Sequence, residues 1–169
     1  MRYTLVMSER SSGILLWRRA DAASDDPEQQ LEVLLTHPGG PYWEDKDQGS
    51  WAIPKGVNEP GESERQAALR EFNEETGAGL EICLDQLEPL GETRNAAGRH
   101  VIIFAFEGDF DTAGFSSNFC TIEWPKKSGQ YQEIPEMDAA EWFTIAAARD
   151  KLFPRQQIFL DRLLTLSQA

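Results

Sequence analysis

The acidic residues between positions 56 and 78 have the types and spacing best suited to chemistry. The segment reads GVNEPGESERQAALREFNEETGA, and its period predicts a helix over most of its second half. At about 100° per residue, Glu71, Glu74 and Glu75 fall within about 100° of arc. Three carboxylates would therefore share one side of the helix, next to an apolar stripe that includes Phe72.

Like charges one turn apart repel each other, so folding alone does not favour this pattern. A hard divalent cation explains it, because Mg²⁺ takes carboxylate and phosphate oxygens as ligands. The glycine-rich turn before the helix allows close approach of the backbone, so a carbonyl at Lys55 or Gly56 could add a ligand. Arg70 lies beside the acidic face, where pairing with Glu62 or Glu74 would orient the carboxylates.

A solvated helix face is the competing interpretation of these acids. The short run EFNEE, taken alone, fits that interpretation, because most acidic clusters on helices simply face water. The wider spacing of the segment distinguishes the two interpretations.

The whole segment resembles the signature of the Nudix hydrolases, G-x5-E-x7-R-E-U-x-E-E-x-G-U, where U is a bulky apolar residue. Its fixed positions are filled by Gly56, Glu62, Arg70, Glu71, Phe72, Glu74, Glu75 and Gly77. Ala78 departs from the pattern by being small, which affects packing more than chemistry. SSGILLWRR and WAIPKG upstream, with EWPKKSG downstream, resemble a bacterial subgroup of predicted NTP pyrophosphohydrolases.

The resemblance implies an α/β fold, the Nudix α/β/α sandwich, in which a mixed β-sheet has flanking helices. Residues 1–169 would form a single Nudix domain with the signature at 56–78. The implied reaction is hydrolysis of a nucleoside diphosphate linked to a group X, with an NTP pyrophosphohydrolase as the leading expectation. A diadenosine polyphosphate hydrolase is the nearest alternative. A non-catalytic nucleotide-sensing module is a further one, although such modules usually carry a broken signature.

The resemblance also assigns roles within the signature. Glu71, Glu74 and Glu75 would be ligands of Mg²⁺ or Mn²⁺, aided by the carbonyl of Lys55 or Gly56. The orienting pair would be Arg70 and Glu62. Such cations neutralise developing charge on a phosphate and activate a bound water.

The general base has several candidates. Glu71 or Glu75 could serve, but members of the family also recruit an acid from a later loop. Glu136 is the first choice there, because it lies in EIPEMD just before a predicted strand. The other acids of this region, each more typical of an ordinary surface position, are Glu123, Glu133 and Asp138.

Substrate contacts would come from outside the signature. Lys55 directly precedes Gly56, so it is the cation best placed to meet a phosphate. Trp43 lies in a long polar loop, where it could stack on a base. Packing against the core is an equally good interpretation of Trp43.

The remaining pattern supplies elements that could position these residues. An apolar strand at 11–19 is expected to pair with 31–36 as a hairpin, across a polar loop at 21–30. A brief strand is expected at 51–54 and a turn at 55–61. The helix should begin at Glu62 or Ser63, with Ser63 as its N-cap, and end near Thr76 with Gly77 left-handed. Further strands are predicted at 90–94, 101–107, 119–124 and 140–144, and helices at 145–152 and 154–166.

The charge balance limits the partners. The 29 acidic and 16 basic residues give a formal net charge of −13. Non-specific binding to a nucleic-acid duplex or an anionic membrane is disfavoured, since both depend on Lys and Arg. The expected partner is a small-molecule nucleotide, bound through metal, and a homodimer is possible.

Cysteine spacing and the first residues point to a reducing compartment. Cys83 and Cys120 have no spacing typical of zinc sites, so we expect two buried free thiols rather than a disulfide framework. The apolar runs in residues 1–19 are too short for a signal-peptide core or a membrane span. A cytoplasmic protein is therefore expected.

Overall fold

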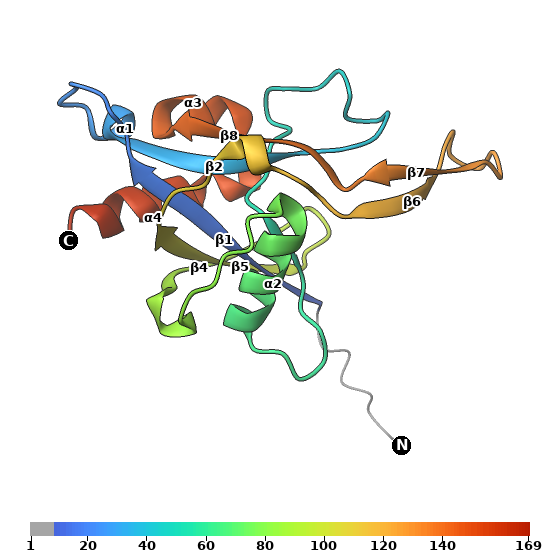
Figure 1. Cartoon of the computed structure of the whole chain (residues 1–169), viewed down its shortest axis with the longest axis horizontal. Helices are drawn as coiled ribbons and strands as arrows, with labels where there is room; N and C mark the ends of the chain where they lie inside the picture. The colour runs from blue at the N-terminus through green and yellow to red at the C-terminus, as the bar shows by residue number, and fades with distance from the viewer. Residues whose placement is uncertain (1–8) are drawn as a thin grey trace.

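A mixed six-stranded sheet forms the centre of the computed structural model, which describes residues 9–169 (Figure 1). Its strand order is β4-β5-β1-β2-β8, with β3 paired to β1. The strands are β1 (Arg10–Arg19), β2 (Leu31–Pro38), β3 (Lys55–Val57), β4 (Glu88–Arg94), β5 (His100–Glu107) and β8 (Met137–Thr144). The expected lack of an export signal concerns residues 1–19, of which 1–8 lie outside the described range.

Strand β1 is central because both of its faces are apolar. It runs parallel to β5 along its length, and antiparallel to β3 at its start and to β2 at its end. Successive side chains of a strand point to opposite faces of the sheet. Ile14 and Leu16 accordingly enter one core cluster, whereas Leu15 and Trp17 enter the other.

The two clusters make a three-layer molecule. On one face, α2 (Glu64–Thr76) buries Ala68 and Phe72 against β1 and β5. On the other, α3 (Ile145–Lys151) and α4 (Ile158–Ser167) bury Ile145, Phe159 and Leu163. The prediction of an α/β/α sandwich with a mixed sheet is confirmed (Figure 1).

A separate hairpin extends from the sandwich. Strands β6 (Phe119–Glu123) and β7 (Tyr131–Pro135) form their own two-stranded sheet, which projects away from the sandwich beyond the start of β8 (Figure 1). Its base returns the chain directly to the start of β8 at Met137.

Local predictions for the first half of the chain were wrong in two places. The expected loop at 21–30 ends in a short helix, α1 (Pro27–Gln30), because the side chain of Asp26 caps it and Pro27 occupies its first turn. The expected strand at 51–54 forms only isolated bridges, whereas the turn expected at 55–61 begins with β3. β3 forms there because the start of β1 offers it an open edge.

Three further expectations differ from the structure. Strand β7 was not expected, because its sequence YQEIP lacks an apolar run and depends on pairing with β6. The helix expected at 154–166 divides into a 3-10 turn at Pro154–Gln156 and α4. Cys83 is exposed and Cys120 half-buried, so the expectation of two buried thiols is also wrong.

Membrane insertion by a helix has no support in this part of the chain. No helix within residues 9–169 combines the length and the apolar character needed to cross a bilayer.

Candidate active site

Helix α2 carries the acidic residues and has well-defined ends. The Ser63 hydroxyl accepts a bond from the N–H of Gln66, whose side chain accepts one from the N–H of Ser63, forming a capping box. At the other end, Gly77 is left-handed at φ 69° and donates its N–H to the carbonyl of Asn73. The predicted cap and stop are confirmed.

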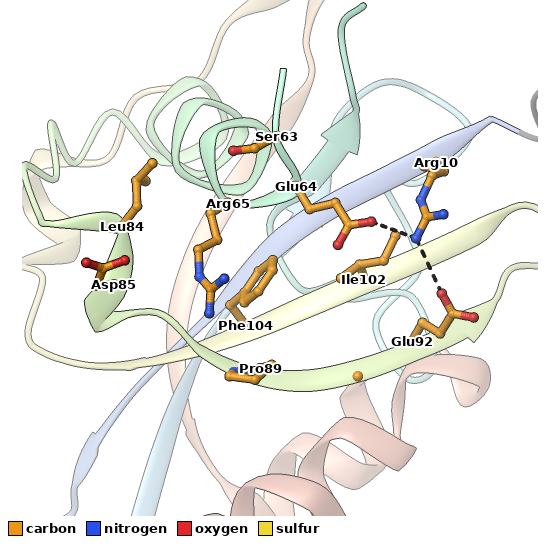
Figure 2. A pocket seen from close by; sticks show the side chains of 11 residues that line it. Arg10, Ser63, Glu64, Arg65, Leu84, Asp85, Pro89, Glu92, Ile102 and Phe104 are labelled. Atoms are coloured by element: carbon orange, nitrogen blue, oxygen red, sulfur yellow. Dashed lines mark ion pairs between the residues drawn. The ribbon is translucent and has the colours of Figure 1, made fainter. Parts of the chain in front are cut away.

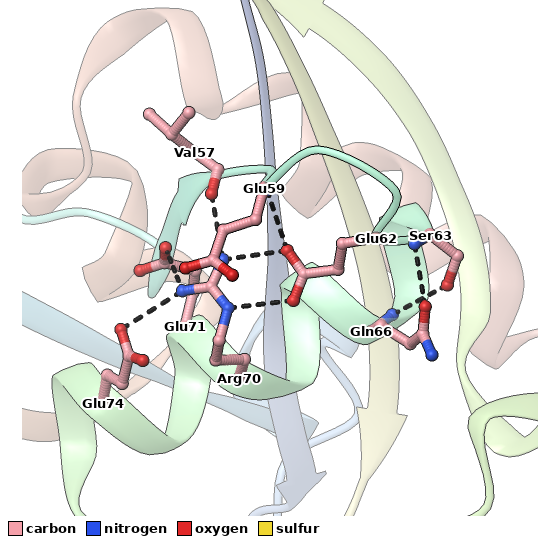
Figure 3. A network of polar contacts seen from close by, with 8 residues as sticks. All are labelled: Val57, Glu59, Glu62, Ser63, Gln66, Arg70, Glu71 and Glu74. Atoms are coloured by element: carbon pink, nitrogen blue, oxygen red, sulfur yellow. Dashed lines mark hydrogen bonds and ion pairs between the residues drawn. The ribbon is translucent and has the colours of Figure 1, made fainter.

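Arg70 connects the acids of the site, as Figure 3 shows. Its Nε and Nη2 donate to the two oxygens of Glu62 at 2.9 and 3.0 Å. Its Nη1 donates to Glu71 at 2.7 Å and to Glu74 at 3.3 Å, and Nη2 also reaches the carbonyl of Val57 at 3.0 Å. Hydrogen bonding to Arg70 lowers the pKa of Glu62. Arg70 therefore pairs with both predicted partners and with a third.

Gly56 and Glu71 are in close contact. A Cβ atom built on Gly56 would lie 2.1 Å from the carboxyl carbon of Glu71. Only glycine leaves room for the carboxylate against the backbone of β3. Burial raises the pKa of Glu71, and Arg70 opposes that rise.

Glu75 is the most buried acid of the site, with 6% of its surface exposed. Its Oε2 accepts a hydrogen bond of 3.1 Å from the backbone N–H of Lys55. Burial raises the pKa of Glu75 to about 8, and the charge of Lys55 acts in the opposite direction. A carboxylate held in this way lacks sufficient positive charge nearby, which suits a cation ligand.

Glu136 lies close enough to act on the helix acids. Its negative charge contributes to raising the pKa of both Glu71 and Glu75. Its backbone is fixed on both sides, since its N–H donates to the carbonyl of Asn118 and its carbonyl accepts from Gly39. Of the later acids considered from the sequence, this is the one that the structure brings to the site.

The other candidate bases have different surroundings. Asp138 accepts a 2.7 Å hydrogen bond from the ring of His37. Glu123 accepts one from the N–H of Gly129 near the tip of the hairpin, and Glu133 is exposed on β7. The charges that shift the pKa values of Glu71 and Glu75 include that of Glu136 but not those of Asp138, Glu123 and Glu133.

Lys55 lines a cavity beside the site, whereas Trp43 does not. The cavity has about 390 Å³ and is also lined by Phe153. The ring of Trp43 packs edge-on against Phe153, with 5.5 Å between ring centroids, and edge-on against Tyr42. Trp43 therefore supports the wall of the cavity instead of forming its surface, and its role as a base-stacking residue stays a prediction.

The glutamate oxygens of the site suit a hard cation, although in this structure they are bound to other partners and do not surround one point. Within residues 9–169, no three His, Cys, Asp or Glu side chains are placed to hold a metal ion as they stand. Arg70 draws away Glu71 and Glu74, and the N–H of Lys55 holds Glu75. Their oxygens are nevertheless the ligands that Mg²⁺ and Mn²⁺ prefer. The ligand roles of these glutamates and of Gly56 stay predictions.

Two positions that sequence reasoning missed help to hold the site. Asn118 donates its N–H to the carbonyl of Glu74 at 3.1 Å while it binds Glu136, so it connects the end of α2 with the candidate base. Gln156 is buried, and its side chain accepts from the N–H of Ile53, two residues before Lys55. Neither residue has a sequence signal, because each acts through a contact with a distant segment.

The sequence matches a family model over most of its length. The model of the NUDIX domain matches residues 15–163. The chain belongs to the Nudix family. Its resemblance to Nudix hydrolases, noted from the signature, is thereby confirmed at the level of the family.

Known Nudix proteins share the fold. The Ap4A hydrolase of C. elegans, solved as a binary complex, has a TM-score of 0.58 and 19% identity, with 94% of this chain and 98% of that chain covered. A mutT/nudix family protein from Listeria innocua has a TM-score of 0.57 and 19% identity, covering 95% and 94%. An RNA pyrophosphohydrolase from Erythrobacter litoralis (strain HTCC2594) is 43% identical over 37 residues, which span 22% of this chain and 23% of that protein.

Proposed function

We propose that this Nudix protein is a metal-dependent pyrophosphohydrolase that cleaves a nucleoside diphosphate linked to X, with nucleoside triphosphates as the leading substrates. The observation that carries the proposal is the gathering of acids around α2. Glu71 and Glu75 lie against β3, Glu74 follows on the same side, and Glu136 approaches from the chain before β8.

These oxygens would hold Mg²⁺ or Mn²⁺, with the backbone at Gly56 close enough to Glu71 to contribute its carbonyl. The bound ions would neutralise charge on the phosphates and lower the pKa of a coordinated water. Arg70 and Glu62 act as the orienting pair, because the two-pronged contact between them fixes the guanidinium that also binds Glu71 and Glu74.

Glu136 is the proposed general base. It lies outside the helix, yet its charge acts on the pKa values of Glu71 and Glu75. A base in that position would take the proton of the attacking water while the helix acids remain metal ligands. The backbone N–H of Lys55 is bound to Glu75, so its side-chain ammonium is the group that would contact a substrate phosphate.

A panel of nucleotides with Mg²⁺ and Mn²⁺ tests the proposal. Glu74→Gln and Glu75→Gln should each lower kcat/KM by at least about 100-fold, because each removes a charged ligand oxygen. Glu81→Gln, an exposed substitution with the same change of charge, is the control. Full activity in both ligand variants would exclude the metal-site assignment.

Hydrolysis of dinucleoside polyphosphates is the second candidate function. The similarity in fold to an Ap4A hydrolase is consistent with it, and so is the cavity beside Lys55. Release of pyrophosphate from an NTP, compared with release of ATP from diadenosine tetraphosphate, separates the two. A non-catalytic nucleotide sensor would bind nucleotides without releasing either product.

The remaining features of the proposal concern the setting of the reaction. We expect one Nudix domain over residues 1–169, a cytoplasmic location and a small-molecule partner instead of a nucleic-acid duplex or a membrane. The surplus of acids supports the last point, since phosphates would approach this chain only through metal and a few cations. Homodimer formation is open to direct measurement by light scattering.

A further inference from the structure

We propose that the cavity beside Lys55 is a second phosphate-binding subsite, formed by Arg94 and Arg155, and that the enzyme therefore prefers nucleotides with more than two phosphates in the chain. The inference rests on the proposed function, because it assigns the phosphates nearest the metal to the acidic site. It adds two specificity-determining residues that lie far outside the signature.

Basic residues line one cavity of this acidic protein. It has about 390 Å³, a size within the usual range of small-ligand sites. Its three charged lining residues are all basic, although the chain has a net charge of −13. The lining residues are Lys55, Thr93, Arg94, Asn95, Ala96, Val101, Phe153, Pro154, Arg155 and Gln156.

The three cations also lack acidic partners. Among residues 9–169, no carboxylate lies within ion-pair distance of Lys55, Arg94 or Arg155. Unpaired cations that converge on one cavity attract an anion, and guanidinium groups match the geometry of phosphate.

A larger cavity on the α2 side of the sheet shows the contrast (Figure 2). It has about 640 Å³ and is lined by Arg10 and Arg65, but three acids, Glu64, Asp85 and Glu92, line it as well. Arg10 pairs with Glu64 at 2.6 Å and with Glu92 at 3.7 Å. Its positive charge is already compensated. The anion site is therefore identified by the charges of the residues that line a cavity, and not by the volume of the cavity.

Two hydrogen bonds anchor the turn that carries Arg155, an exposed residue that lines the same cavity as Lys55. The turn that carries it donates the N–H of Phe153 to the carbonyl of Trp51 at 2.8 Å. On the other side of Arg155, buried Gln156 accepts from the N–H of Ile53 at 2.9 Å. These two bonds explain why the C-terminal helix is interrupted at Pro154–Gln156, and they bind the turn to the segment that enters β3.

Arg94 lines the same cavity from the end of β4. It is the last residue of β4, and its Nη1 donates to the carbonyl of Gly98 at 2.8 Å across the turn to β5. The turn itself is ordered by Asn95, whose side chain accepts from the N–H groups of Ala97 and Arg99. One guanidinium edge is engaged in this way, which leaves the remaining donors for a ligand.

Lys55 joins this subsite to the acidic site. Its backbone N–H binds Glu75, and the residue also lines the cavity. A phosphate chain that begins at the metal-binding acids would reach the cavity after passing Lys55. Val101 and Phe153 add apolar wall, and apolar surroundings strengthen the attraction between guanidinium and phosphate.

Calorimetric titration with inorganic tripolyphosphate, in excess Mg²⁺, tests the subsite without any hydrolysis of nucleotide. Arg94→Gln and Arg155→Gln should each weaken binding about tenfold, the usual effect of losing a charged hydrogen bond. Arg99→Gln is the matched control, because Arg99 lies in the same turn and is exposed like Arg94, but it pairs with Glu9 and does not line the cavity. Equal affinity in all three variants would overturn the proposal.

Steady-state kinetics then tests the substrate preference. KM for diadenosine tetraphosphate should rise about tenfold in the Arg94 and Arg155 variants at unchanged kcat, whereas KM for ADP-ribose should change less than about twofold. Equal increases for both substrates would contradict a subsite for distant phosphates. If the wild-type enzyme hydrolyses neither substrate, the proposed function fails, and the titration still decides whether the subsite exists.

Discussion

At the scale of single residues, burial strongly disfavours the charged form of Glu75. The carboxylate is enclosed between α2 and β3 and receives one hydrogen bond, from the N–H of Lys55. Its pKa rises to about 8 because burial disfavours the charged form. A group with a pKa raised in the folded state destabilises the metal-free protein as the pH increases from about 4.5 to about 8.

Glu75→Gln should therefore stabilise the metal-free protein while it removes activity. The neutral amide has nearly the same shape and needs no counter-charge, so we expect the melting temperature at pH 8.5 to rise by about 5 °C or more. At pH 5, where Glu75 is largely protonated, the two proteins should melt within about 2 °C of each other. Thermal scans with chelator present measure both values, and a gain of equal size at both pH values would contradict the explanation.

Gly56→Ala tests the contact between β3 and Glu71. The added methyl group would lie 2.1 Å from the Glu71 carboxyl carbon, so that carboxylate must move. Because the displaced atoms end a flexible side chain, we expect the melting temperature to change by less than about 3 °C and kcat to fall at least about tenfold. Gly114→Ala, where nothing lies near the added atom, is the control. Unchanged kcat would remove Gly56 and Glu71 from the proposed metal site.

At the scale of elements, the loop between β2 and β3 is held by several polar contacts. Buried His37 binds Asp138 through Nδ1 and the carbonyl of Lys46 through Nε2, each at 2.7 Å. Asp47 pairs with Lys151 of α3 and accepts from the indole of Trp51 at 2.8 Å. These contacts fix a long segment without regular structure, and with it the Trp43 ring that supports Phe153.

Asp47→Asn should weaken this attachment in a pH-dependent way. Hydrogen bonding to Lys151 lowers the pKa of Asp47, so the charged carboxylate contributes stability above its ordinary pKa and loses it as the pH falls below that value. We expect the melting temperature to fall by about 1–3 °C at pH 7, since exposed pairs contribute little, and the difference to shrink towards pH 3. Asp45→Asn, an exposed neighbour, is the control. If the difference in melting temperature persists at pH 3, the cause is the changed shape of the side chain and not its charge.

At the scale of the whole molecule, the surplus of acids couples stability to metal. Four carboxylates, those of Glu71, Glu74, Glu75 and Glu136, lie around one end of the sandwich, where the cations that oppose them are Arg70 and Lys55. A ligand that binds only the folded state stabilises it by mass action.

Saturating Mg²⁺ should therefore raise the melting temperature by about 5–10 °C, and a chelator should reverse the effect. The Glu75→Gln protein should show less than a third of that shift. Scanning calorimetry over a range of Mg²⁺ concentrations measures the dependence. Equal shifts in both proteins would mean that Mg²⁺ acts on the general surface charge and would contradict a specific site.

The signature helix and most of the strands could be predicted closely, whereas a few surrounding elements could not. Ser63 and Gly77 determine the ends of α2 through local capping, so these ends follow from neighbouring residues alone. Strands β3 and β7 form only because β1 and β6 offer them partners. The 3-10 turn at Pro154 depends on a bond between Gln156 and Ile53, more than 100 positions apart in the chain.

The sequence by itself determined the family and the set of acids on α2, because a helix places residues by a fixed rotation that spacing reveals. Tertiary structure alone decided that Glu136, not Glu123, Glu133 or Asp138, lies beside these acids. It also decided that Lys55, Arg94 and Arg155 line one cavity. These residues come from the start of β3, the end of β4 and a turn before α4, and only the pairing of strands and the docking of that turn bring their charges together.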